Sequence, residues 1–122
     1  MESLKKLSVL LLLLCSTVAA AHDFEVDGIY YNITDETAKT VEVTYKGAYS
    51  NEYYYEYSGK VTIPSEVTYN GVTYDVTRIG DEAFLNCRWL DEVVIPKSVR
   101  VIGKDVFNES NNVSTIHSDD SA

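Results

Sequence analysis

The sequence predicts a repeat solenoid of short strands and short helical turns, mainly β with some α, behind a small antiparallel β cap. A segment that begins at Arg78 recurs 23 residues later, and β-branched and aromatic residues partly alternate with polar ones before residue 60. An Asn-Gly pair at 70–71 separates two further alternating runs. Recurrence at a fixed period of about 20 to 50 residues is the signature of stacked repeats. The 122 residues, 45% hydrophobic and 24% charged, indicate one domain.

Residues 1–21 have the pattern of a secretory signal peptide. Two lysines precede the apolar run 7–14, and three alanines ending at Ala21 offer a cleavage site. The run is far shorter than the roughly 20 apolar residues of a membrane-spanning helix, so no span is expected. We predict export with cleavage after Ala21. Lipidation at Cys15 is the alternative, which Leu14 disfavours because lipoprotein peptidases prefer a small residue before the cysteine.

Net charge and cysteine content exclude several classes of partner. Without residues 1–21, which hold two lysines and one glutamate, the formal net charge of −9 becomes −10. Nucleic acid and anionic lipid require a positive footprint, so neither is expected as a partner. Cys87 is then the one remaining cysteine and cannot form an internal disulfide. A lone cysteine on an apolar face usually behaves as a small buried hydrophobe, and a reactive thiol is the alternative.

Residues 22–60 are expected to form the β cap. The segments 28–33 and 40–45 are β-branched and aromatic with a polar stretch between them, which predicts a hairpin. The segment 49–59 is polar and rich in tyrosine, and it leads into a short predicted strand at 61–64.

Residues 61–117 are expected to form the repeat region, with a hairpin inserted at 65–76. Asn70 and Gly71 supply the two positive-φ positions of a type I′ turn between alternating runs. Residues 118–122 form a polar tail. The tail either caps the open edge of the stack or is the accidental end of a truncated gene.

Seven positions that are apolar or small recur in register across the 23-residue period. The pairs are Ile79 with Ile102, Gly80 with Gly103, Ala83 with Val106, Phe84 with Phe107, Cys87 with Ser110, Leu90 with Val113 and Val93 with Ile116. A partial third copy matches Val61, Ile63 and Pro64 to Val93, Ile95 and Pro96, and the inserted hairpin accounts for its extra length.

One copy is interpreted as a strand, a bend and a helical turn. Val93 and Ile95 point inward from the strand, Pro96 ends it, Gly103 begins the next turn, and Asp81 caps the corresponding turn of the first copy. Stacked copies bury a continuous core that one copy cannot bury alone. The predicted repeat core comprises Ile79, Gly80, Ala83, Phe84, Cys87, Leu90, Val93, Ile95, Ile102, Gly103, Val106, Phe107, Val113 and Ile116.

The segment IGDEAFLNCRWLDEVVIP at 79–96 resembles the BspA-like leucine-rich repeats of bacterial cell-surface proteins. The opening FEVDGIYYNI at 24–33 is similar to the N-terminal segment of such proteins in Bacteroidales. The resemblance implies a leucine-rich-repeat solenoid that is secreted or exposed on the cell surface. It further implies adhesion to host extracellular-matrix proteins or to other bacteria, without catalysis or cofactor. Family members usually carry many more repeats than this chain does.

Catalytic and metal-binding residues are not expected. His22 and His117 both lie near chain ends, where a general base is hardest to hold rigidly. The acidic pairs at 81–82, 91–92 and 119–120 lack the alternating ligand spacing of a calcium loop. No enzyme activity, cofactor or metal is therefore predicted.

The tyrosine cluster is the candidate binding surface. Consecutive aromatic residues on a strand point to both faces, so at least one should be exposed. These rings either cover the open end of the stack or contact a partner. The cluster consists of Tyr53, Tyr54, Tyr55 and Tyr57.

The predicted function is a non-catalytic protein-binding or adhesion module that is secreted or exposed on the cell surface. The alternative is the truncated N-terminal cap of a longer repeat protein with no activity of its own.

Overall fold

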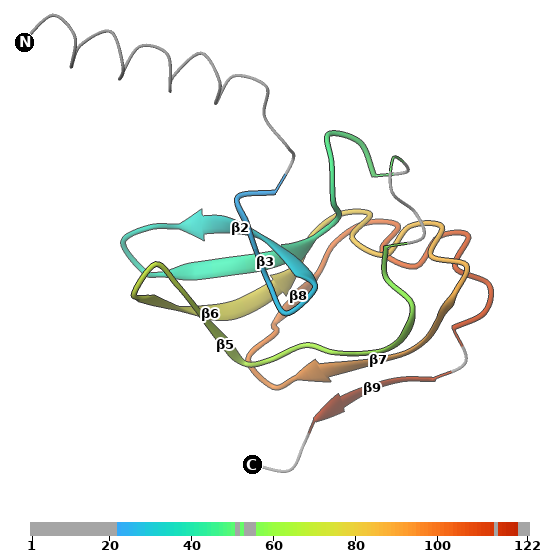
Figure 1. Ribbon diagram of the computed structural model, residues 1–122. Helices are drawn as coiled ribbons and strands as arrows, with labels where there is room; N and C mark the ends of the chain where they lie inside the picture. The colour runs from blue at the N-terminus through green and yellow to red at the C-terminus, as the bar shows by residue number, and fades with distance from the viewer. Residues whose placement is uncertain (1–21, 51, 53–55, 114, 120–122) are drawn as a thin grey trace, which may run out of the picture.

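The computed structural model describes residues 22–50, 52, 56–113 and 115–119, and the regular elements of this part of the chain are strands (Figure 1). The predicted signal peptide, with Cys15 and Ala21, lies outside it. The bounds of the strands are β1 Phe24–Val26, β2 Ile29–Asp35, β3 Thr40–Thr44, β4 Gly59–Thr62, β5 Glu66–Tyr69, β6 Val72–Ile79, β7 Leu90–Pro96, β8 Val101–Ile102 and β9 Thr115–Asp119.

Strands β1, β2 and β3 form the antiparallel cap. β2 pairs with β3 in the register Tyr31↔Val43, which confirms the first predicted hairpin. The turn between β1 and β2 holds Asp27 and Gly28 at φ 51° and 81°. Aspartate and glycine are among the residues that tolerate this left-handed conformation, so the local sequence specifies the turn.

Strands β5 and β6 form the second hairpin, at the predicted place. Asn70 and Gly71 have φ of 51° and 77°, as a type I′ turn requires, and Tyr69 pairs with Val72 beside them. β6 pairs with β5 as far as Asp75 and continues to Ile79, where it pairs with β3 and β8 in the stacked part of the molecule.

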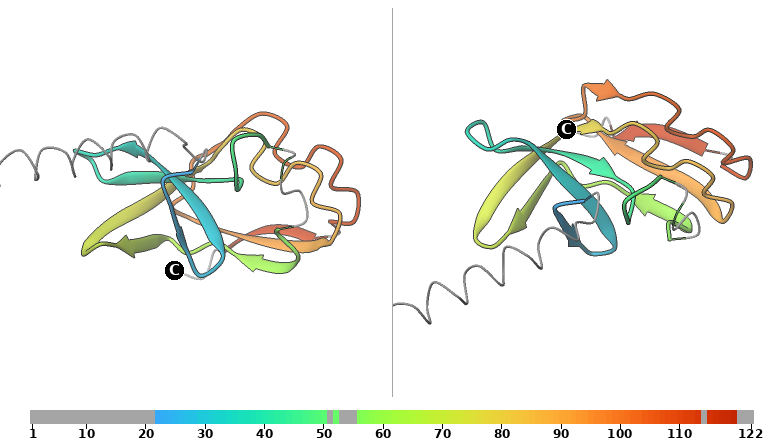
Figure 2. Two further views of the ribbon diagram at one scale, coloured as in Figure 1. Left: turned by 45° about the horizontal axis from the view of Figure 1, so that its top comes forward. Right: turned by 90° about the horizontal axis from the view of Figure 1, so that it is seen from above.

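Two sets of parallel strands stack along the molecule. β3, β6 and β8 are neighbours in the larger sheet, and β4, β7 and β9 form the smaller sheet. Ile79 pairs with Ile102 and Val93 with Ile116, so the 23-residue period is the step from one coil to the next. Val61 pairs with Val93, which confirms the partial third copy. The sheets lie one above the other and turn segments join them at one side (Figures 1 and 2).

The predicted helical turns are wrong, because residues 81–86 and 104–109 form successive tight turns and no helix occurs in the described residues. A left-handed residue interrupts a right-handed helix. Each segment contains two left-handed residues, and those of the second segment lie 23 residues after those of the first. The repeat therefore extends to the backbone conformation. The left-handed residues are Glu82 at φ 59°, Asn86 at 54°, Asp105 at 53° and Glu109 at 59°.

Hydrogen bonds between coils take the place of those within a helix. Asp81 was predicted to cap a helical turn. Its carboxylate instead accepts hydrogen bonds from the Lys104 N–H at 2.8 Å and from the Arg78 guanidinium at 2.9 Å. Alternate N–H groups of the first turn segment donate to carbonyl oxygens of the second. The pairs are Glu82 to Lys104 at 2.9 Å, Phe84 to Val106 at 3.0 Å and Asn86 to Asn108 at 2.8 Å.

The core runs continuously from the cap into the coils. Tyr57 packs on Phe84 with ring centroids 4.8 Å apart, and Phe84 stacks on Phe107 at 5.6 Å. The Tyr57 hydroxyl donates to the Thr44 carbonyl oxygen at 2.7 Å and accepts the Tyr30 N–H at 3.0 Å. Tyr57 therefore ties the cap to the first coil through both its ring and its hydroxyl.

The predicted repeat core is buried in its first copy and opens in its second. Ile79, Phe84, Leu90 and Val93 are fully buried. The remaining predicted core positions that are buried are Gly80, Ala83, Cys87, Ile95 and Val106. Gly103, Phe107 and Val113 are half-buried. Ile116 lies in β9, where its backbone pairs with Val93.

Ile102 was predicted to be buried, and this is wrong: its side chain is 53% exposed. It lies in β8, which pairs with β6 on one side. Among the described residues no strand pairs with the other side of β8. Burial of this repeat position therefore requires a further coil.

Candidate binding surface

The structure removes Tyr57 from the candidate binding surface. This side chain is 4% exposed and hydrogen-bonded within the core, so it cannot contact a partner. Tyr53, Tyr54 and Tyr55 lie outside the described residues. Tyr49, which the sequence did not single out, is 70% exposed.

The outer face of the smaller sheet carries the side chains that alternate with the core positions. Lys60 pairs across the sheet with Glu92, and their side-chain nitrogen and oxygen lie 4.0 Å apart. Thr62 pairs with Val94 on the same face. On β4 and β7 the face presents a cation, an anion, a hydroxyl and an apolar group, and protein interfaces likewise combine polar and apolar groups.

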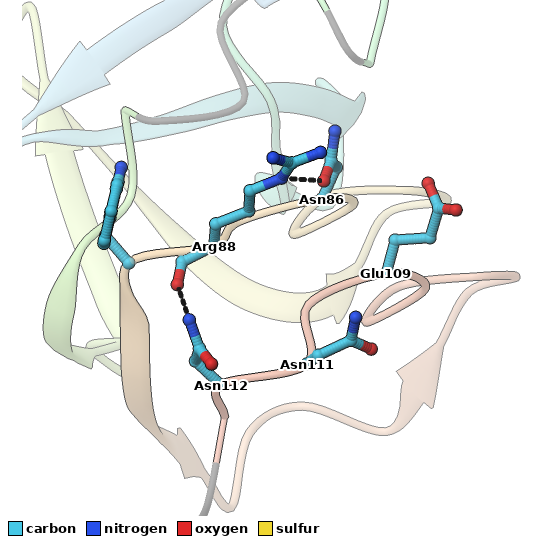
Figure 3. A pocket seen from close by; sticks show the side chains of 6 residues that line it. Asn86, Arg88, Glu109, Asn111 and Asn112 are labelled. Atoms are coloured by element: carbon cyan, nitrogen blue, oxygen red, sulfur yellow. Dashed lines mark hydrogen bonds between the residues drawn. The ribbon is translucent and has the colours of Figure 1, made fainter.

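A hollow of about 350 Å³ lies where each turn segment leads into the next strand. Figure 3 shows that its side chains come from two neighbouring coils, one chain segment above the other. Each residue of the upper segment has its counterpart 23 residues later. The pairs are Asn86 with Glu109, Arg88 with Asn111 and Trp89 with Asn112.

Two hydrogen bonds hold the walls of this hollow (Figure 3). The Arg88 Nε–H donates to Asn86 Oδ1 at 3.1 Å within one coil. The Asn112 Nδ2–H donates to the Arg88 carbonyl oxygen and so links the two coils. Trp89 is 64% exposed beside them. The hollow therefore combines an exposed indole ring with amide groups that neighbouring backbone and side-chain atoms hold in place.

A family model described as a BspA-type leucine-rich repeat region of six copies matches residues 47–122. The chain belongs to the BspA-type leucine-rich repeat family. The match begins within the predicted cap and includes every coil, so the resemblance stated from residues 79–96 is confirmed. Leucine-rich repeat proteins are in general non-catalytic modules whose stacked coils create extended binding surfaces.

Solved structures of other bacterial leucine-rich repeat proteins share the fold. One from Bacteroides ovatus is 39% identical over 78% of this chain and 23% of its own, with a TM-score of 0.65. A leucine rich cell surface protein from Faecalibacterium prausnitzii is 23% identical over 85% of this chain and 24% of its own, also at 0.65. A third, from Bacteroides capillosus, is 26% identical over 78% and 64%, with a TM-score of 0.60.

This BspA-type chain spans about a quarter of the length of the first two of these proteins. No curated protein matches it. The shared leucine-rich-repeat fold is shown, whereas the predicted α content is not, since the described residues hold turns where helical turns were expected.

A second hollow, of about 420 Å³, lies between the cap and the first coil of this BspA-type protein. Ile29 and Val67 contribute apolar surface to it, while Asp27 and Glu66 place two carboxylates at it. The two acidic groups would favour a basic side chain over an anion.

Burial shifts the pKa of two titratable groups that the sequence analysis considered, His22 and Cys87. Burial lowers the pKa of His22, whose ring makes an edge contact with Tyr30 at 4.9 Å. Burial raises the pKa of the Cys87 thiol to about 12, so the thiol is protonated at neutral pH and a poor nucleophile. Among the described residues no three His, Cys, Asp or Glu side chains form a group that could hold a metal ion. His117 lies in β9, where the backbone pairing alone is described.

Trp89 is a second exposed aromatic residue that the sequence analysis missed. Trp89 lies in the turn that precedes β7, next to the fully buried Leu90. The 23-residue repeat indicates that Trp89 is exposed. Its counterpart in the next copy is Asn112, a polar residue that a core position would not accept.

Proposed function

We propose that this chain is an extracellular, non-catalytic protein-binding module of the leucine-rich repeat type. The observation that carries the proposal is the outer face of β4 and β7, whose side chains lie outside the core and in register from one coil to the next. Stacked coils can vary these side chains without disturbing the core, which is how repeat proteins acquire partners.

Export and surface exposure are part of the same proposal. The signal-peptide pattern of residues 1–21 supports export, and family membership supports a place on the cell surface. No helix in the described part of the chain has the length and apolarity that a membrane crossing requires. The partner class that the family resemblance implies is a host extracellular-matrix protein or the surface of another bacterium.

Binding to immobilised fibronectin, laminin and collagen tests the proposal. We expect saturable binding to at least one of them, weakened about tenfold or more by Val94→Glu, since a buried interfacial charge without a partner costs at least ~1.4 kcal/mol. Thr37→Glu adds the same charge at an exposed position in the cap turn and serves as the matched control. Absence of binding to all three, or equal loss in both variants, would contradict the proposal.

A second candidate is that the chain caps a longer solenoid and has no binding activity of its own. The exposure of Val101 and Ile102, 47% and 53%, favours it, because both are large apolar side chains on β8 that a further coil would cover. Thermal unfolding of residues 22–122 by circular dichroism separates the two. A cooperative transition supports a finished module, and a gradual, featureless melt supports the cap.

A further inference from the structure

We propose that the hollow beside Trp89 is a saccharide-binding site that takes an uncharged pyranose unit of a glycan. The site lies on the turn side of the coils, separate from the outer face of the smaller sheet (Figure 3). It goes beyond the proposed protein-binding function and does not depend on it.

The exposed indole is the first element of the site. Trp89 is 64% exposed, which leaves most of the side chain of a large aromatic residue in contact with water. A flat aromatic ring stabilises a partner that offers a flat face of weakly polarised C–H bonds, and the ring itself carries a single polar N–H. Pyranose rings present such a C–H face, with hydroxyl groups around its edge.

The three asparagines are the second element. A primary amide is both a donor and an acceptor, as a sugar hydroxyl is, so the two can exchange hydrogen bonds in either direction. Asn86 uses its oxygen for Arg88 and Asn112 uses one N–H for the Arg88 carbonyl, which leaves an amide NH₂ on the first and an amide oxygen on the second. Within the described residues the Asn111 side chain makes no hydrogen bond.

Charge and size select among ligand classes. Arg88 and Glu109 contribute opposite formal charges to the lining, so the hollow favours neither phosphates nor carboxylates over neutral ligands. Trp89 is the one large apolar side chain of the lining. The hollow therefore offers an aliphatic ligand little apolar surface to pack against. A volume of about 350 Å³ lies at the low end of the range for small-molecule sites, roughly 300–1,000 Å³, and suits a ligand of one or two rings.

The hollow is also held in shape before any ligand arrives. The Asn112 bond to the Arg88 carbonyl joins the two coils, and the Asn86 N–H donates to the Asn108 carbonyl oxygen at 2.8 Å in the same region. Side chains that are already ordered lose less conformational freedom on binding, so a small polar ligand can be held at a useful affinity.

Tryptophan fluorescence of the full chain tests the proposal directly, because Trp89 is its one tryptophan. The probes are lactose, N-acetyllactosamine, chitobiose and maltose, each raised to about 10 mM, a concentration that half-saturates a site whose dissociation constant is about 10 mM. We expect a saturable change in emission with at least one of them. Asn111→Ala should weaken that binding at least about threefold, since it removes a hydrogen-bonding side chain.

Asn108→Ala is the matched control, because the Asn108 side chain is exposed in the preceding turn segment and does not line the hollow. The substitution keeps the backbone carbonyl oxygen that accepts the Asn86 N–H. It should leave the affinity unchanged. No emission change with any of the four sugars would overturn the proposal, as would equal weakening by Asn108→Ala and Asn111→Ala. An equal response to N-acetylglycine amide would assign the hollow to a peptide. Matrix-protein binding through β4 and β7 can succeed or fail without altering any of these results.

Discussion

The buried hydroxyl of Ser110 shows how one side chain can join two coils. It accepts the Cys87 N–H at 2.8 Å and donates to the Phe84 carbonyl oxygen, both in the preceding coil. Ser110 and Cys87 occupy the same repeat position, so one copy carries a hydrogen-bonding group where the other carries a small hydrophobe. The serine satisfies two backbone groups that would otherwise lack partners in the core.

Substitution of this serine should destabilise the protein more than substitution of a serine without partners. Ser110→Ala leaves the Cys87 N–H unsatisfied, and we expect the free energy of unfolding to fall by about 1–3 kcal/mol. Ser98 is the control, since its buried hydroxyl has no partner among the described residues, and Ser98→Ala should stay within about 0.5 kcal/mol of the parent. Urea denaturation measures both, and equal midpoints would contradict the expectation.

Alkaline pH should unfold the protein through its buried tyrosines and its cysteine. Burial raises the pKa of Tyr30 and Tyr31 from 10.0 to about 12, and that of Cys87 from 9.0 to about 12. The unfolded chain therefore releases protons between about pH 9 and 12 that the folded chain keeps, and stability falls as the pH rises. We expect urea midpoints to decline across this window. Urea midpoints that stay constant across this window would contradict it.

At the scale of the element, the turn segments depend on close contact between coils. The first segment satisfies alternate N–H groups with carbonyl oxygens of the second, so the two backbones must approach within hydrogen-bond distance. Glycine permits that approach at Gly80 and at Gly103, the same repeat position in successive coils. A methyl group at Gly103 would meet the backbone nitrogen of Asp81 at 2.7 Å and its carboxylate oxygen.

Replacing these glycines by alanine should therefore have unequal effects. Gly103→Ala places its methyl group against backbone, which cannot move aside, and should cost about 1–3 kcal/mol of stability. At Gly80 the closest atom is the Glu42 Cδ at 2.9 Å, part of a flexible side chain, although the Val43 carbonyl oxygen lies at 3.0 Å. Gly80→Ala should cost less. A thermal melt of each variant checks the order, and the reverse order would refute the steric argument.

At the scale of the whole molecule, burial depends on where a coil lies in the stack. Val43, Ile79 and Ile102 pair in one row across β3, β6 and β8, with side chains 0%, 0% and 53% exposed. The first two are covered by neighbouring strands on both sides. The same repeat position therefore contributes to the core in one coil and faces solvent in the next.

This difference predicts unequal costs for the same substitution at equivalent positions. Ile79→Ala removes a fully buried side chain and should lower the free energy of unfolding by about 2–5 kcal/mol. Ile102→Ala removes a half-exposed one and should lower it by less than about 1 kcal/mol. Urea denaturation of the two variants measures the difference. Similar losses would mean that another chain, such as a second copy, covers β8 in solution.

Local rules were sufficient for the hairpins and for the period. Asn70-Gly71 and the alternating runs beside it predict a two-residue turn whatever surrounds them. The 23-residue recurrence predicts which strands stack, and the observed pairing of Val93 with Ile116 follows it. The family could be inferred as well, because the repeat positions themselves form the motif.

Neighbouring coils decided what the sequence could not. The turn segments are not helical because the N–H groups of the first donate to carbonyl oxygens of the second, which no pattern within one repeat reveals. Tyr57 is buried rather than exposed because the cap supplies both partners of its hydroxyl. The hollow at Trp89 exists where equivalent residues of two coils face each other.

The sequence by itself determined the repeat, its period, its hairpins and its family, since each depends on spacing and local conformational preference along one chain. The tertiary structure decided which repeat positions are buried and which polar and aromatic side chains meet at a surface. Burial and hydrogen bonding require a partner from another coil, and the distance along the chain to that partner, often 23 residues or more, places it beyond any local pattern.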